Sequence, residues 1–138
     1  MLAGLVIASV TCLALVVLGH RAKRHAESIS CGNCMCSIGF AAKTWALDNG
    51  GHLPCDFCSM LNYMATTRIL VCPGDHGRIP ATNWSSLNQT NCSYEIVAPG
   101  LSVDDTTNVY FRCKYHGYFG YADGTVFDGK QRRRKDSW

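Results

Sequence analysis

Cysteine is the residue type with the most obvious chemistry here, with nine cysteines in 138 residues. Four of them form two Cys-x2-Cys pairs, Cys31 with Cys34 and Cys55 with Cys58, and 20 residues separate the two pairs. Four thiolates at this spacing can bind Zn²⁺ in a tetrahedral arrangement, as they do in a zinc ribbon. The sequence therefore offers a candidate zinc site made of Cys31, Cys34, Cys55 and Cys58.

Disulfides are the interpretation that we favour over zinc, so we expect no resident metal or other cofactor. The first Cys-x2-Cys pair falls in a predicted helix rather than in a knuckle turn, and Cys36 adds a third thiol beside it. A head exported to an oxidising compartment would retain disulfides. The remaining cysteines show no metal-like spacing: Cys12, Cys72, Cys92 and Cys113. Without Cys12, eight thiols remain, enough for four bridges.

Catalysis is not predicted from any motif of the chain. His116 together with Asp75 or Asp123 could act as an acid–base pair, but His116-Gly117 and Asp123-Gly124 are more typical of turns. The sequence holds no Gly-x-Ser-x-Gly, His-Glu-x-x-His or phosphate-binding loop. We therefore expect a protein that is not an enzyme, with no catalytic or cofactor-binding residues.

The elements that would position these thiols begin with one long helix over residues 2–49. Its first part, residues 2–19, is an 18-residue run without a charge. At about 1.5 Å per residue this run is about 27 Å long, close to the thickness of a bilayer core. We expect residues 1–19 to be a transmembrane half; a cleaved signal peptide and a buried core helix are the alternatives.

The second part of the helix, residues 20–51, begins with the basic segment 20–25 and is amphipathic. Ile38, Ala41, Ala42 and Trp45 follow the spacing i, i+3, i+4, i+7, which predicts one apolar stripe packed on the rest of the protein. Asn49-Gly50-Gly51 predicts the end of the helix.

Residues 52–129 are expected to form a small β-rich head. Strand-like segments lie at residues 94–97, 109–113, 118–122 and 125–127, and a short apolar run at 69–72 resembles them. Between Lys43 and Gly129 there are five basic and eight acidic residues, so we expect no nucleic-acid partner. Residues 130–138 are predicted to be a basic, disordered tail.

Several of these segments together resemble the bacterial type IV pilin-like and type II secretion pseudopilin-like family. They are residues 21–24, 29–33, 38–41 and 45–54 of the helix and its end, Cys72-Pro73-Gly74-Asp75 in mid-chain, and residues 116–126, which run from His116 through Asp123-Gly124. The segments occur in the family's order over nearly the whole chain. The resemblance implies an α+β fold in which a long N-terminal helix, its first half transmembrane, packs on a small antiparallel sheet.

The resemblance also implies a function and a location. The function is that of a non-catalytic, membrane-anchored structural subunit of a type IV pilus or a type II secretion-like assembly. Its partners would be the membrane and copies of itself or related pilin-like subunits, contacted through the N-terminal helix. The location would be the bacterial inner membrane, crossed once, with the head in the periplasm or outside. The alternative is a membrane-tethered zinc-binding module with a cytoplasmic head, which the positive charges after the apolar run favour.

The chain departs from the family at its N-terminus. Family members begin with a basic leader, followed by Gly and an apolar residue, and carry Glu at the fifth mature position. Here no basic residue precedes the apolar run, and Ser9 follows Gly4 at the position of that Glu. We therefore expect either that the reading frame begins upstream of Met1 or that the processing signal is missing or degenerate.

Overall fold

The computed structural model describes residues 2–129, with side chains from residue 11 onward, so the expected tail of residues 130–138 lies outside the described part. One helix, α1 (Leu2–Asp48), precedes four strands: β1 (Tyr94–Ile96), β2 (Val109–Cys113), β3 (Tyr118–Tyr121) and β4 (Val126–Asp128). All strand pairs are antiparallel. The prediction of an α+β fold with a long N-terminal helix and a small antiparallel sheet is therefore confirmed.

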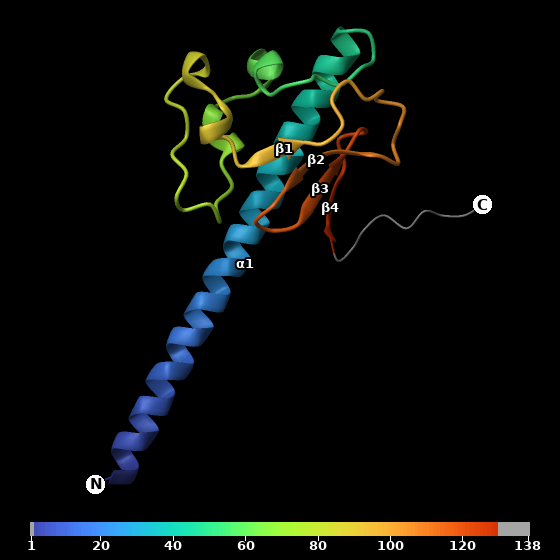
Figure 1. Cartoon of the computed structure of the whole chain (residues 1–138). Helices are drawn as coiled ribbons and strands as arrows, with labels where there is room; N and C mark the ends of the chain where they lie inside the picture. The colour runs from blue at the N-terminus through green and yellow to red at the C-terminus, as the bar shows by residue number, and fades with distance from the viewer. Residues whose placement is uncertain (1, 130–138) are drawn as a thin grey trace, which may run out of the picture.

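Helix α1 has two unequal environments, because its N-terminal half projects away from the head and its C-terminal half crosses the sheet (Figure 1). The helix ends where its sequence predicts. Gly50 and Gly51 have φ angles of 85° and 81°, and the Gly51 amide donates to the Ala46 carbonyl at 2.7 Å. Within the described residues, no helix includes a stretch long and apolar enough to cross a membrane.

The inner face of α1 supplies one side of the core. Its buried positions recur every three or four residues and are at most 1% exposed: Cys31, Met35, Ile38, Ala41, Ala42 and Ala46. This spacing keeps them on one side of a helix of 3.6 residues per turn. They pack with Tyr110 and Phe111 of β2 and with Leu70. The predicted stripe of residues 38–45 thus packs on the head, with Trp45 partly buried at its edge.

The sheet is a meander with the strand order β1-β2-β3-β4. Phe111 of β2 lies opposite Gly120 of β3, and a Cβ at Gly120 would overlap the Phe111 ring. The register shifts between Val109 and Phe111. At this bulge the buried Tyr110 hydroxyl donates to the Pro54 carbonyl at 2.7 Å, which ties the sheet to the segment that follows α1.

The segment between α1 and the sheet contains four short 3-10 helices: η1 (Cys58–Tyr63), η2 (Thr67–Leu70), η3 (Trp84–Ser86) and η4 (Gln89–Asn91). The interpretation of residues 69–72 as strand-like is therefore wrong for their first part. Polar side chains near the start of η2 explain the difference. The Thr66 side chain accepts from the Arg68 amide, and the Thr67 hydroxyl donates to the Ala81 carbonyl at 2.6 Å.

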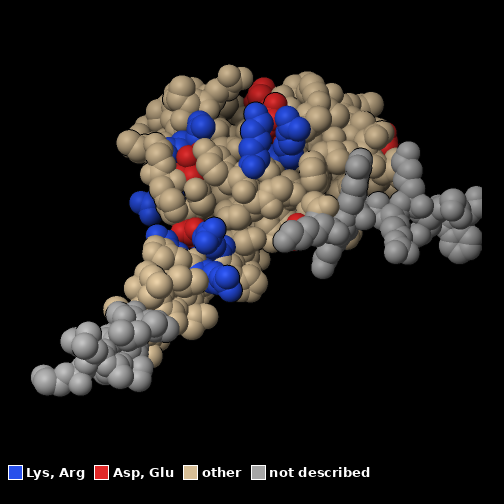
Figure 2. Space-filling view, turned by 60° about the horizontal axis from the view of Figure 1, so that its bottom comes forward, with Lys and Arg blue, Asp and Glu red and all other residues tan. Residues whose placement is uncertain are grey.

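Several charged residues of the head form ion pairs. On the face shown in Figure 2, acidic side chains lie beside basic ones. Glu95 on β1 accepts from Arg112 on β2 at 2.8 Å and from Lys114 at 3.0 Å. These partners are substantially exposed, so the pairs contribute little stability individually and mainly fix the register of β1 on β2.

Candidate metal centre

Three cysteines and one histidine from four different segments meet between α1 and the sheet. Cys31 comes from α1, Cys72 follows η2, Cys113 ends β2, and His116 lies in the turn between β2 and β3. One sulfur or nitrogen atom from each lies within 4.8 Å of the corresponding atom of every other. We call this group the Cys3His cluster.

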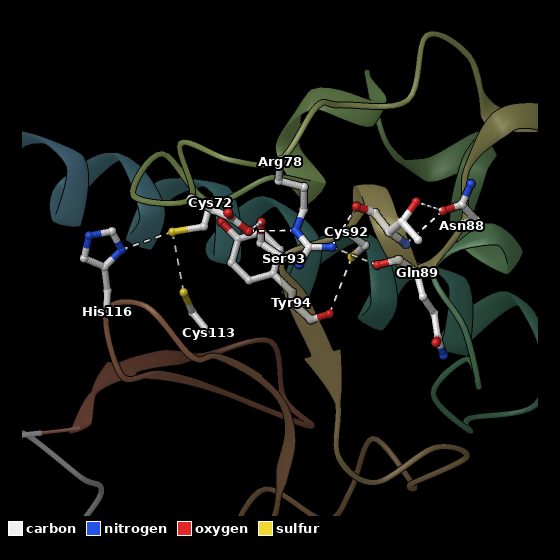
Figure 3. Close-up of polar contacts among 11 residues, drawn as sticks. Cys72, Arg78, Asn88, Gln89, Cys92, Ser93, Tyr94, Cys113 and His116 are labelled. Atoms are coloured by element: carbon white, nitrogen blue, oxygen red, sulfur yellow. Dashed lines mark hydrogen bonds and ion pairs between the residues drawn. The ribbon is translucent and has the colours of Figure 1, made fainter.

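Distances within the Cys3His cluster are short. The sulfur of Cys113 lies 3.5 Å from that of Cys31 and 3.6 Å from that of Cys72. The imidazole Nδ1 of His116 lies 3.1 Å from the sulfur of Cys72. Figure 3 shows the Cys72 sulfur between His116 and Cys113, both of which point toward it.

The three cysteines are sealed from solvent, with Cys31 0%, Cys72 1% and Cys113 2% exposed. Cys31 is buried because it continues the inner face of α1, four residues before Met35. The Tyr94 hydroxyl lies 3.7 Å from the Cys31 sulfur and closes the cluster from the side of β1. Because burial excludes water, any charge that develops on these sulfurs must be compensated within the protein.

Cys72 is positioned by the turn that follows it. The Asp75 amide donates to the Cys72 carbonyl at 2.8 Å, and the Asp75 carboxylate accepts from Arg78 at 2.7 Å and from Ser93 at 2.9 Å. Gly74 leaves room for the imidazole, since an ideal Cβ there would lie 2.7 Å from Cε1 of His116. The segment Cys72-Pro73-Gly74-Asp75 therefore fixes the position of the Cys72 thiol and leaves room for the His116 ring.

Cys113 and His116 are brought together by a tight turn. The Gly117 amide donates to the Cys113 carbonyl at 3.1 Å, and Gly117 has a φ of 69°, a conformation in which glycine carries no steric penalty. The turn folds the chain back so that the His116 ring reaches the sulfur of Cys72, which belongs to a different segment. Both residues depend on the β2–β3 connection for their place.

The electrostatics of the Cys3His cluster divide the three thiols into two kinds. Side-chain hydrogen bonding with Cys31, and then with Cys72, lowers the pKa of Cys113, and backbone hydrogen bonds from His116 and Tyr115 lower it further. Side-chain hydrogen bonding with Cys113 raises the pKa of Cys31, and raises that of Cys72 to about 11.

The four cysteines of the alternative zinc site offered by the sequence do not come together. Cys31 alone joins the Cys3His cluster. Cys34, one turn further along α1, is half-buried, and burial raises its pKa. Cys55 and Cys58 are exposed and line an open cleft of about 700 Å³ together with Cys92.

Sequence reasoning missed Cys72, Cys113 and His116 as possible ligands. One local signal was available, because Cys113-x2-His116 has the spacing of a metal knuckle. All nine cysteines are unbridged in the described structure. The disulfides favoured from the sequence therefore stay a prediction.

The His116–Asp pair considered as an acid–base pair is not formed. Asp75 bonds to Arg78 and Ser93, and His116 bonds to Cys72. Asp123 instead accepts from the Thr125 amide at 3.0 Å within the β3–β4 turn. His116 and Asp123 do lie in turns, as the sequence favoured, but the side chains of His116 and Asp75 make further contacts outside those turns.

Comparison with protein-family models, with curated proteins and with solved structures gives no match to this chain.

Proposed function

We propose that the chain is a non-catalytic, pilin-like structural subunit whose helix α1 packs against the helices of other copies or related subunits. One observation carries the proposal: four large apolar side chains recur along the outer face of α1 and stay more than half exposed among the described residues. Leu18, Ile29, Phe40 and Leu47 are between 52% and 71% exposed. At 100° per residue, these four positions fall within about 40° of one another around the helix axis. We call them the outer stripe.

The outer stripe lies opposite the face that packs on the head. Its positions are about 180° around the helix from Ile38, which is fully buried. The exposed residues His25, Cys36 and Lys43 interrupt the stripe on the same face. Large apolar side chains that recur along one helix face still mark a candidate interface, whereas scattered ones are normal on a protein surface. A helix with apolar faces on both sides is suited to lie between its own head and neighbouring helices.

The projecting half of α1 supports the same proposal. Leu13, Leu15, Val16 and Val17 are 43–70% exposed, and the head does not reach this part of the helix (Figure 1). An isolated helix in water gains little from its own hydrogen bonds and depends on packing for stability. A bundle of such helices, with the heads outside it, would cover these side chains.

The proposal also includes insertion of α1 into a membrane. In it, the first part of α1 is rooted in a bacterial inner membrane, and the head lies on the periplasmic side. A reporter that is active only outside the cytoplasm, fused after Trp138, tests this orientation. A well-expressed but silent fusion would contradict it.

Charge reversal on the outer stripe tests the assembly. We expect Phe40→Glu to shift the purified full-length chain in mild detergent from an oligomer toward a monomer, measured by light scattering after size exclusion. Ser37→Glu is the matched control, because Ser37 is exposed on the same turn but about 60° away from Phe40 around the axis. A monomeric wild-type chain, or equal effects of the two substitutions, would refute the proposal.

A further inference from the structure

We propose that the chain binds one zinc ion through the sulfurs of Cys31, Cys72 and Cys113 and Nδ1 of His116. This site is separate from the outer stripe and does not depend on assembly. It also differs from the set of Cys31, Cys34, Cys55 and Cys58 that the sequence offered.

The atom spacing matches the edges of a zinc tetrahedron. With Zn–S distances of about 2.3 Å and Zn–N of about 2.0–2.1 Å, two ligand sulfurs lie about 3.8 Å apart and a sulfur and nitrogen about 3.6 Å apart. The sulfur of Cys113 lies 3.5 Å from that of Cys31 and 3.6 Å from that of Cys72, and His116 Nδ1 lies 3.1 Å from the Cys72 sulfur. These three distances are shorter than the ideal edges by about 0.2–0.5 Å, and the other three are at most 4.8 Å, so shifts of up to about 1 Å would complete the tetrahedron.

A disulfide fits the Cys3His cluster less well. Bonded sulfurs are separated by about 2.05 Å, far less than the 3.5 and 3.6 Å found here. Moreover, three sulfurs lie together, so that any one bridge would leave an odd thiol buried beside His116. A metal uses all four side chains at once.

Simple packing of cysteines as small apolar side chains does not account for the cluster either. Apolar packing gives no reason for an imidazole nitrogen to face a buried sulfur, as His116 faces Cys72.

The ligand set selects the metal and its role. Three thiolates and one imidazole are soft ligands that suit Zn²⁺ and not Ca²⁺ or Mg²⁺. Four protein ligands leave no open position for water or substrate, which is the arrangement of structural zinc sites. Because the ligands come from α1, the segment after η2, and the β2–β3 hairpin, the ion would fasten the helix to the head.

Metal content of the full-length chain, purified under reducing conditions, tests the proposal. We expect one zinc per chain by mass spectrometry of the metal. Replacement of zinc by Co²⁺ should give intense visible bands of a tetrahedral site and an ultraviolet thiolate-to-cobalt band. Less than one tenth of an equivalent in the folded wild-type chain after zinc addition would overturn the proposal.

Ligand variants separate this site from other thiols. Cys31→Ser, Cys72→Ser and Cys113→Ser should each weaken zinc binding at least about tenfold. The matched control is Cys34→Ser, which removes a half-buried thiol one turn from Cys31 and should keep one zinc. The double variant Cys55→Ser/Cys58→Ser should also keep one zinc. Loss of zinc in either control, or its retention in the Cys72 and Cys113 variants, would overturn the assignment.

A histidine series keeps the test informative if a cysteine variant does not fold. His116→Cys supplies a fourth thiolate, so it should retain one metal and strengthen the cobalt charge-transfer band by about one third. His116→Phe should lose the metal. An unchanged band in His116→Cys would overturn the role of His116. A bridge from Cys113 to Cys31 or Cys72, found by mass spectrometry of the unreduced chain from its own compartment, would overturn zinc binding.

Discussion

Gly39→Ala tests how closely helix α1 packs on the β3–β4 hairpin. An ideal Cβ at Gly39 would lie 2.8 Å from the backbone oxygen of Gly124, and one at Gly124 would lie 3.2 Å from the Gly39 oxygen. The two backbones therefore touch without a side chain between them. Gly124 has a φ of 83° in the turn, so its carbonyl is held by backbone geometry and cannot swing aside as a side chain would.

The magnitude follows from two opposing effects. Replacing glycine by alanine inside a helix stabilises it by about 1 kcal/mol. At Gly39 the new methyl group must push the Gly124 carbonyl back by about 0.6 Å to reach ordinary contact at 3.4 Å. Overpacking of this kind costs about 1–3 kcal/mol. In Gly39→Ala, the gain in helix stability and the cost of overpacking thus change the free energy of unfolding in opposite directions.

Gly32→Ala is the control that isolates the packing cost. Gly32 lies two turns earlier in α1, and its ideal Cβ would meet only the Tyr118 ring at 3.7–3.8 Å, an ordinary contact. This variant should gain the full helix stabilisation. Gly39→Ala should therefore be less stable than Gly32→Ala by about 1–3 kcal/mol in the free energy of unfolding.

Urea unfolding followed by the fluorescence of Trp45 and Trp84 measures this difference, since both side chains pack against the core. Metal and reductant must be the same for both variants. Equal stability of Gly39→Ala and Gly32→Ala would refute the close approach of α1 to the hairpin. A gain of about 1 kcal/mol at both positions would mean that the hairpin lies further from the helix.

Three further predictions concern the same head. Tyr110→Phe removes the hydroxyl that donates to the Pro54 carbonyl, and it should cost about 1 kcal/mol in urea unfolding; no change would mean that this bond is absent in solution. Asp75→Asn should cost about 1–3 kcal/mol at neutral pH, because Asp75 is buried and accepts from Arg78 and Ser93. Burial alone would raise the pKa of Asp75, but hydrogen bonds from Arg78 and Ser93 lower it. The contribution of Asp75 to the free energy of unfolding is therefore complete above about pH 4 and is lost as the pH falls through its lowered pKa. Over that acid range the stability of Asp75→Asn should depend less on pH than that of the wild type. Identical pH profiles would contradict the bonds assigned to Asp75. Gly74→Ala places a Cβ 2.7 Å from the His116 ring and should weaken zinc binding about tenfold in a competition titration. Gly77→Ala is the control and should have no effect, because no atom lies within 4 Å of its ideal Cβ. Equal zinc affinities of the two variants would mean that His116 is not a ligand.

Local patterns predicted the elements of this fold well because the physical causes of those elements are local. The spacing of residues 38–45 identified the inner face of α1, and Asn49-Gly50-Gly51 identified its end. Asp123-Gly124 identified the β3–β4 turn, where Gly124 has a positive φ. The short run at 69–72 was misjudged, because the bond from Thr67 to Ala81 is not visible in a local pattern.

The Cys3His cluster could not be predicted in the same way. Its ligands come from segments separated by about forty residues, so their meeting depends on the packing of α1 on the sheet. Cys-x2-Cys spacing was misleading on α1, because residues three apart on a helix point about 60° away from each other. Cys31 therefore faces the core while Cys34 lies at its edge, and only Cys113-x2-His116 carried a local signal.

The position of the cluster links the two proposals mechanically. Contacts of α1 with the head begin at Glu27, which bonds to His76, and at Ser28, which bonds to Tyr118. Cys31 lies one turn beyond these two contacts, at the first fully buried position of α1 among the described side chains. A force on the projecting half of the helix would reach the head there. A metal bond at that point resists such a force better than packing does, because sliding of α1 would break ligand bonds and not merely exchange apolar contacts. Removal of zinc should therefore loosen α1 from the head before it disturbs the meander, whose strand pairs do not depend on Cys31.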